Sequence, residues 1–282
     1  MKENNTQMAN CDQADVKFSL LKGAAVDLTH GSLFSGIGGF ELGARWSGIK
    51  TIWNCEILPY NQKILKQQFP NTKQYADIKE VTGPEYCDII SGGFPCQNIS
   101  SAGNGKGIKG EKSGLWSEMY RICRQVRPRY IIAENSPMLT FRGLERVLCD
   151  LSEIGYNAQW QCISNKDFGF SHRRERIYII AYTSGIGEER WIWQPAKVSE
   201  IIQRRQDSKI FVQGIFKDGL FVDEEGGSQS ALIGKDDGVS FPLHRIKALG
   251  NSVNPMIANY LFECVKHHAA LVLAAAPLNN GT

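Results

Sequence analysis

A cysteine on a glycine-rich loop is the first feature of the chain with obvious chemical potential. Residues 92–97 read Gly-Gly-Phe-Pro-Cys-Gln and follow the apolar run at 87–90, which is typical of a buried strand. The paired glycines free the backbone, Pro95 stiffens it, and Cys96 is thereby held out at a strand end. Ligands bind at such strand ends in open α/β sheets, and nucleophilic attack needs an accessible thiolate. The pattern favours Cys96 as a nucleophile over an inert buried cysteine.

Charged side chains stand at the ends of two further predicted strands. Glu134 closes the run Tyr-Ile-Ile-Ala-Glu-Asn, and an acid at the end of a buried strand is costly unless it is paired or takes part in chemistry. Arg174 and Arg176 precede and open the run Arg-Ile-Tyr-Ile-Ile-Ala-Tyr. Two residues two positions apart in a strand point to the same side. The arginines could also be ordinary surface charges.

A glycine-rich turn at residues 34–43, Phe-Ser-Gly-Ile-Gly-Gly-Phe-Glu-Leu-Gly, joins a predicted strand to a predicted helix. Such turns let the backbone approach a cofactor and direct helix N–H groups at it. Glu56 ends the next strand, where a carboxylate can hold ribose hydroxyls. Asp77 follows a third strand and fits either a contact to adenine or a helix cap. The dinucleotide pattern GxGxxG would need glycine at position 41, where Glu41 stands.

Strand-length apolar runs alternate with segments of helical period from residue 29 to residue 183. This alternation predicts an α/β fold with a mostly parallel sheet covered on both faces. Residues 1–28 are interpreted as an N-terminal extension. Residues 184–242 are interpreted as a separate short region, because much of it is rich in Gly, Ser, Gln and charged residues. Residues 243–282 form a last segment, in which Pro255 begins a helix.

Composition and length set limits on the class of protein. The chain has 282 residues and a formal net charge of +3, which suits one large soluble domain and neither proves nor opposes a nucleic-acid partner. Its eight cysteines show no metal-ligand spacing, so no metal is expected. No signal peptide is visible at the N-terminus, which predicts a cytoplasmic, nucleoid-associated protein. The apolar run 269–278 is about half a membrane span, so we expect the buried end of a helix and no membrane.

Charge is distributed unevenly along the chain. Residues 103–129 carry seven basic residues against two acidic ones, in part on a glycine-rich segment, which favours a loop that closes on phosphates over a merely solvated one. Residues 184–240 carry seven basic residues against ten acidic ones, which is a poor composition for reading DNA unaided. Trp191, Trp193, Arg204 and Arg205 could contact bases there, although an aromatic mini-core fits the tryptophans equally well.

Taken in order, these motifs resemble the DNA cytosine-5 methyltransferases. The resemblance covers about residues 30–183 and 243–268, and the Leu-Gly-Asn-Ser-Val motif at 249–253 is part of it. It implies a Rossmann-like fold that binds S-adenosylmethionine and no metal, a catalytic domain at 29–183 completed by 243–282, and a target-recognition region at 184–242. It implies a catalytic pocket of Cys96, Glu134, Arg174 and Arg176. It implies a cofactor site of Phe34, Ser35, Gly36, Gly38, Gly39, Glu56, Ile57, Asp77, Ile78, Pro95, Leu115, Asn251 and Ser252, and DNA contacts from Gln97, Ser100, Lys106, Lys109 and Lys112.

The chain departs from the family pattern at several positions. Asn98-Ile99 and Ser136 stand where Pro-Phe and Val are usual, and His172 replaces a Gln. None of these changes removes a catalytic group, so the resemblance still implies methylation of a flipped-out cytosine in double-stranded DNA. It also implies that the protein acts as a monomer. A restriction endonuclease or an accessory recognition protein could accompany it. The alternatives are a tRNA cytosine-5 methyltransferase, a silent DNA-binding relative, and an NAD- or FAD-dependent oxidoreductase.

Overall fold

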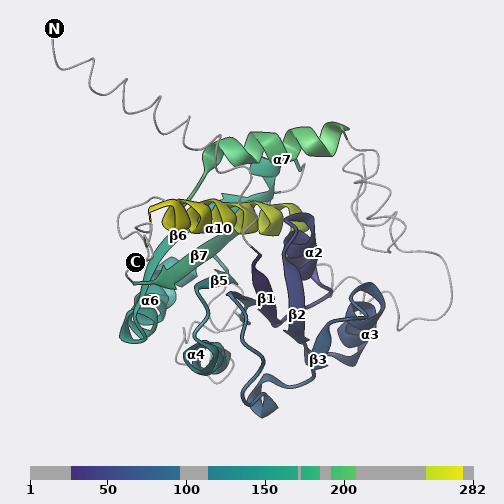
Figure 1. The fold of residues 1–282 in the computed structure, drawn as a ribbon, viewed down its shortest axis with the longest axis vertical. Coiled ribbons are helices and arrows are strands. Elements are labelled where there is room, and N and C mark those ends of the chain that lie inside the picture. The colour runs from purple at the N-terminus through teal and green to yellow at the C-terminus, as the bar shows by residue number, and fades with distance from the viewer. Residues whose placement is uncertain (1–26, 96–113, 171–172, 185–191, 208–251, 276–282) are drawn as a thin grey trace, which may run out of the picture.

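The structure, a computed structural model, describes residues 27–95, 114–170, 173–184, 192–207 and 252–275. A seven-stranded sheet of order β3-β2-β1-β4-β5-β7-β6 forms its centre, as Figure 1 shows. The strands are β1 (Thr29–Leu33), β2 (Lys50–Cys55), β3 (Lys73–Tyr75), β4 (Ile89–Gly93), β5 (Tyr130–Asn135), β6 (Tyr156–Ser164) and β7 (Glu175–Thr183). The predicted α/β fold with a mostly parallel sheet is confirmed.

One strand of the sheet runs against the others. The neighbouring pairs among β1 to β5 are parallel, whereas β7 is antiparallel to both β5 and β6. Parallel strands present their carboxyl ends at one edge of a sheet, and an antiparallel neighbour begins at that same edge. The residues that open β7 therefore lie beside those that close β5, and Asn135 pairs with Ile177 there.

The helices alternate with the strands as the periodicity predicts. They are α2 (Gly39–Trp46), α3 (Pro59–Gln68), α4 (Leu115–Val126), α5 (Leu139–Arg142), α6 (Leu144–Glu153), α7 (Pro195–Asp207) and α10 (Pro255–Ala275), with 3-10 turns η1 (Ile78–Glu80) and η3 (Asn165–Phe168). The segment of helical period after β5 forms two helices, separated at Gly143, where a φ of 152° leaves the helical region. Pro255 begins α10 as predicted.

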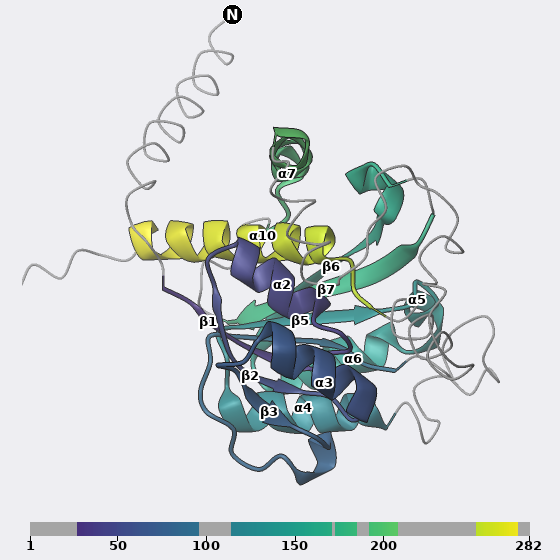
Figure 2. The ribbon, with the colours of Figure 1, turned by 90° about the vertical axis from the view of Figure 1, so that its right-hand side faces the viewer.

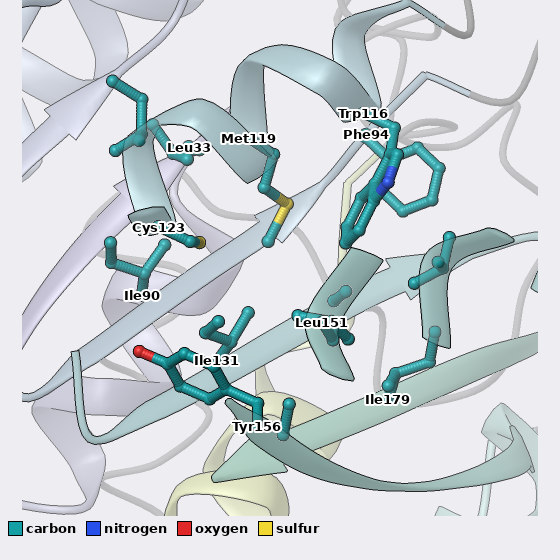
Figure 3. Packing of buried hydrophobic residues seen from close by; sticks show 14 of the residues in the cluster. Leu33, Ile90, Phe94, Trp116, Met119, Cys123, Ile131, Leu151, Tyr156 and Ile179 are labelled. Carbon is teal, nitrogen blue, oxygen red and sulfur yellow. The ribbon is translucent and has the colours of Figure 1, made fainter. Parts of the chain in front are cut away.

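Two hydrophobic cores lie on opposite faces of the sheet. On one face α4 and α6 cover the strands, and Figure 3 shows Met119 and Leu151 packed over Ile131 and Ile179. On the other face α2 and α10 cover alternate residues of the same strands, and α7 packs against α10; Figure 2 shows α10 lying beside α2. Alternation of Ile131 and Ile132 between the two cores gives near-continuous apolar strands, as expected for a sheet buried on both faces.

The last helix packs closely on the first. A Cβ built on Gly43 of α2 would lie 2.5 Å from the Cβ of Ala258 in α10, so only glycine permits this approach. A Cβ on Gly39 would lie 2.3 Å from the carbonyl oxygen of Val253. The segment that leads into α10 is thereby placed against the start of α2, immediately after the glycine-rich turn.

The end of α10 differs from the expectation drawn from its apolar sequence. Ala269 is fully buried, residues 270–272 and 274 are half-buried, and Leu273 is 53% exposed. The helix end is present as predicted, but it is only partly buried. No helix within the described ranges is long and apolar enough to cross a membrane.

Candidate active site and cofactor-binding turn

The described residues of the predicted site follow the carboxyl ends of the parallel strands or open β7. Phe34, Ser35, Gly36, Gly38 and Gly39 follow β1, Glu56 and Ile57 follow β2, Asp77 and Ile78 follow β3, and Pro95 follows β4. Glu134 is the penultimate residue of β5, and Arg174 and Arg176 stand at the start of β7. Leu115 is the first residue of α4, and Ser252 precedes α10. This is the edge at which ligands bind in open α/β sheets.

The glycine-rich turn has an unusual backbone. Phe34, Gly36 and Gly38 have φ values of 54°, 58° and 97°, which lie in the left-handed region. For a bulky residue such as Phe34 this conformation is rare, and such backbone is concentrated at functional sites. A Cβ built on Gly36 would meet nothing within 4 Å, so open space lies over the turn. The turn can therefore receive a ligand against its backbone.

Glu56 joins the ends of β1 and β2. Its Oε2 accepts a hydrogen bond from the Gly36 N–H at 2.7 Å, and its Oε1 accepts one from the Leu58 N–H at 2.8 Å. Burial raises the pKa of Glu56, and these N–H donors oppose the rise. Each carboxylate oxygen can accept a second hydrogen bond. The side chain can therefore hold the turn and still accept bonds from ligand hydroxyls.

Asp77 has the capping role that the sequence left open, because its Oδ1 accepts a hydrogen bond from the Lys79 N–H at 2.9 Å at the start of η1. The other oxygen is not part of this cap and can accept from a ligand. Ile57, 62% exposed, and Leu58, 43% exposed, lie between Glu56 and α3. Exposed apolar side chains beside a carboxylate suit a flat heterocycle next to a ribose.

Glu134 and Arg176 form an ion pair at the centre of this edge, with Arg176 Nε 3.1 Å from Glu134 Oε1. Glu134 is only 8% exposed, and burial raises its pKa, whereas the charges of Arg176 and Arg174 oppose the rise. A Cβ on Gly93 would lie 2.8 Å from Glu134 Oε2, so glycine at the end of β4 leaves room for the carboxylate. The structure thus brings Glu134 and Arg176, two residues that the sequence singled out separately, into contact.

Asn135 fixes the chain that leads toward the predicted nucleophile. Its Nδ2 donates a hydrogen bond to the carbonyl oxygen of Phe94 at 3.1 Å, and both residues are buried. Cys96 itself lies outside the described residues, as do Asn251 and the predicted DNA contacts Gln97, Ser100, Lys106, Lys109 and Lys112. The structure brings the base-binding and cofactor-binding candidates to one edge and gives no position for these seven.

The basic cluster predicted at 103–129 is only in part available to phosphates. Arg121 donates to the carbonyl oxygens of Ile78 and Val81, and Arg127 donates to that of Ile154. Arg129 lies 3.9 Å from Asp88. The charge count over 103–129 therefore overstates what this stretch offers to phosphates, because a count cannot show that backbone carbonyls and a carboxylate elsewhere in the fold engage three of its arginines.

The short region at 184–242 contributes to the second core. Trp193 is 1% exposed and packs with Ile192 and Ile201 among the residues under α10. For Trp193 the aromatic-core alternative is confirmed and a base contact is excluded by burial. The side chains of Trp191, Arg204 and Arg205 lie outside the described residues.

Glu41 is a buried acid that the sequence reading used only to reject a dinucleotide pattern. It lies in the first turn of α2 and is fully buried. Burial raises its pKa to about 7, and the hydroxyls of Ser35 and Ser32 oppose the rise. An acid among the apolar residues of an amphipathic helix was the signal that could have found it.

Replacing Glu41 with Gln should remove a pH-dependent loss of stability. The carboxyl group of Glu41 keeps its proton up to about pH 7 in the folded protein but only up to about pH 4.5 in the unfolded chain. The wild-type free energy of unfolding therefore falls as the pH rises from about 4.5 to about 7. The fall should be about 3 kcal/mol. Urea unfolding at pH 4.5 and pH 8 should show the variant gaining this amount relative to wild type at pH 8. The exposed Glu145→Gln serves as control, and equal pH dependence in wild type and Glu41→Gln would contradict the burial argument.

Comparison with known proteins decides the family. A sequence model of the C-5 cytosine-specific DNA methylases matches residues 28–224. The chain belongs to this family. It is 37% identical over 158 residues to the type II methyltransferase M2.BsuMI of Bacillus subtilis, and 35% identical over 154 residues to M.CviJI of Paramecium bursaria Chlorella virus IL3A. Each match covers 53% of this chain.

Each of these matches covers 41% of the curated relative, so this chain spans less than half of the length of those relatives. Among solved structures, the Entamoeba histolytica methyltransferase EhMeth superposes with a TM-score of 0.61 at 18% sequence identity. That superposition covers 87% of this chain and 99% of the other. At this identity the likeness concerns the fold, and it agrees with the Rossmann-like methyltransferase architecture that the motifs predicted.

Proposed function

We propose that this chain transfers the methyl group of S-adenosylmethionine to carbon 5 of cytosine in double-stranded DNA. The observation that carries the proposal is the ion pair of the buried Glu134 with the half-buried Arg176, which stands at the same sheet edge as the turn held by Glu56. A buried carboxyl group with a raised pKa next to guanidinium groups can bind the edge of a pyrimidine and pass a proton to it. Family membership makes cytosine that pyrimidine.

The residues of the turn fit a nucleoside cofactor that carries a methyl sulfonium. Open space lies over Gly36, and Glu56 retains acceptor capacity for ribose hydroxyls. We assign Asp77 and Ile78 to the adenine side of the cofactor. Ser252 precedes Val253, whose carbonyl oxygen lies against the start of α2. S-Adenosylmethionine supplies an electrophilic methyl group. The chain's own part is to hold the nucleoside, exclude water and align the base with that methyl group.

The chemistry we assign to Cys96 follows from the poor nucleophilicity of cytosine C5. The thiolate of Cys96 adds to C6, the C5–C6 π electrons move toward N3, and Glu134 donates its proton to N3. The resulting enamine can accept a methyl group at C5, which bound S-adenosylmethionine would supply, and the sulfonium would become a neutral thioether. A base then takes the C5 proton, the C6–S bond breaks, and Glu134 recovers its proton from N3.

The arginines have two tasks in this scheme. Arg176 holds Glu134 in place, and the side chain of Arg174, close enough to lower the pKa of Glu134, can bind the base carbonyl. Their positive charge also favours the thiolate of Cys96. Because C5 and C6 are shielded in a duplex, the target cytosine must be rotated out of the stack, at a cost of a few kcal/mol.

Recognition and assembly extend the proposal beyond the described residues. We assign DNA contacts to Gln97, Ser100, Lys106, Lys109 and Lys112, and target reading to residues 184–242, whose acidic balance suits a short site or help from another protein. The catalytic domain at 29–183 is completed by 243–282, and we propose that the protein acts as a monomer without a metal. Its curated relatives are type II methyltransferases, which makes a cognate restriction endonuclease a natural partner.

The proposal is tested by methyl transfer from tritiated S-adenosylmethionine to unmethylated genomic DNA and, separately, to total tRNA. We expect label in DNA only, recovered after digestion as 5-methyldeoxycytidine. Label only in tRNA would move the substrate to RNA and leave the chemistry in place. No transfer to either, in a chain that binds the cofactor, would identify a silent relative or one that needs a partner.

A further inference from the structure

Arg121 is attached to a part of the fold far from its own helix. It lies in the middle of α4, and its Nη2 donates to the carbonyl oxygen of Ile78 at 2.8 Å. Its Nη1 donates to the carbonyl oxygen of Val81 at 2.9 Å. Glu118, one turn earlier on α4, holds the Arg121 Nε at 2.8 Å and so fixes the plane of the guanidinium. A planar fork suits two acceptors at a set spacing.

The segment that Arg121 holds has little other backbone support. It follows β3, a three-residue strand at the edge of the sheet that pairs only with β2. The turn η1 is itself three residues long and begins at Asp77, whose side chain caps it. Short edge elements open more readily than the centre of a sheet, because few hydrogen bonds hold them. The two carbonyls bound by Arg121 lie at the start of η1 and directly after it.

Hydrophobic contacts attach the same segment to the same helix. Ile78 and Val81 are 5% and 1% exposed and share a core cluster with Met119 and Ile122 of α4. These contacts hold the segment against the helix but do not set the direction of its carbonyls. The hydrogen bonds from Arg121 do so, together with the bond from the Val81 N–H to the Ile78 carbonyl within the turn, and thereby orient the peptide planes next to Asp77.

We infer that Arg121 is a positioning residue for the adenine end of the cofactor site. From α4 it holds the backbone at Ile78 and Val81, and so fixes Asp77 and Ile78 where adenine would contact them. The helix that carries Arg121 also begins at Leu115, a further residue assigned to the cofactor, so α4 supports cofactor residues from two segments of the chain. This inference rests on the proposed function, since it concerns the binding of S-adenosylmethionine.

Calorimetric titration of the full chain tests the inference directly. Arg121→Met should raise the Kd for S-adenosylmethionine and for S-adenosylhomocysteine about tenfold, because two carbonyls lose their donors and the turn is no longer held. Arg121→Lys, which can reach one carbonyl, should recover part of the loss. Arg124→Met, exposed on the same helix, is the matched control and should bind as wild type. The kcat at saturating cofactor should change by less than about threefold, because no reacting atom is touched.

A purely structural role would give a different set of results. 5′-Methylthioadenosine carries adenine and ribose without the amino-acid half, and its Kd should rise by the same factor as that of S-adenosylhomocysteine. A lower melting temperature with unchanged Kd values for Arg121→Met, or for Arg121→Lys if the first variant does not fold, would overturn the inference alone. A wild-type chain that binds neither cofactor would overturn the proposed function and this inference with it.

Discussion

Replacing Glu134 with Gln is expected to lower kcat for methyl transfer about 10²- to 10⁴-fold, the range that general acid–base groups contribute. The amide keeps the shape of the side chain but has no proton to pass to N3 of the base. It also removes the negative charge that pairs with Arg176 at 3.1 Å. Steady-state kinetics on DNA with saturating S-adenosylmethionine would measure the loss.

Cofactor binding separates this effect from unfolding. Because Glu134 stands at the end of β5, away from the residues that hold the turn, the Kd for S-adenosylhomocysteine should stay within about twofold of wild type. The exposed Glu145→Gln is a control with the same change of charge. Activity of Glu134→Gln within threefold of wild type would remove Glu134 from the catalytic group.

The second large effect concerns the cofactor. Glu56→Gln should raise the Kd for S-adenosylmethionine about 10- to 100-fold, because the amide group cannot accept at both of its ends. In the wild type one oxygen accepts the Gly36 N–H at 2.7 Å and the other accepts the Leu58 N–H at 2.8 Å. Whichever way the amide is turned, an NH₂ group faces an N–H donor and the turn is displaced.

Steady-state kinetics distinguish weaker cofactor binding in Glu56→Gln from a loss of catalysis. The KM for S-adenosylmethionine should rise with the Kd, whereas kcat at saturating cofactor should fall by less than about fivefold. Glu80→Gln, an exposed change in the neighbouring turn η1, is the control. An unchanged Kd in Glu56→Gln would mean that the carboxylate supports the backbone without contributing to the cofactor site.

Much of the fold and of the site could be predicted because the signals are local. Apolar runs of strand length, Pro255 at a helix start and glycines at a strand-to-helix turn each act over a few residues. The pairing of Glu134 with Arg176 required one more step, namely that β7 runs antiparallel and begins where β5 ends. An apolar run carries no direction, so only the resemblance to a family could supply that step.

The parts that sequence reasoning missed depend on contacts between distant segments. Arg121 was counted only as one of seven basic residues in a stretch of positive charge, and its partners are backbone carbonyls 40 and 43 positions away. Glu41 becomes unusual only once α2 lies beside the end of β1 and burial next to Ser32 and Ser35 removes its solvent. Gly143 breaks a helix whose hydrophobic period continues on both sides. Burial and carbonyl partners are properties of the assembled layers, which neither composition nor spacing reports.

Covalent trapping on DNA tests the central claim most directly. DNA in which 5-fluorocytosine replaces cytosine cannot lose a proton from C5, so an enzyme that forms a bond from Cys96 to C6 and transfers the methyl group stays attached. We expect a protein–DNA adduct that survives denaturation, that requires S-adenosylmethionine, and that is absent in Cys96→Ser. An equal yield of adduct from Cys96→Ser, or methyl transfer to cytosine DNA by that variant at the wild-type rate, would contradict the account.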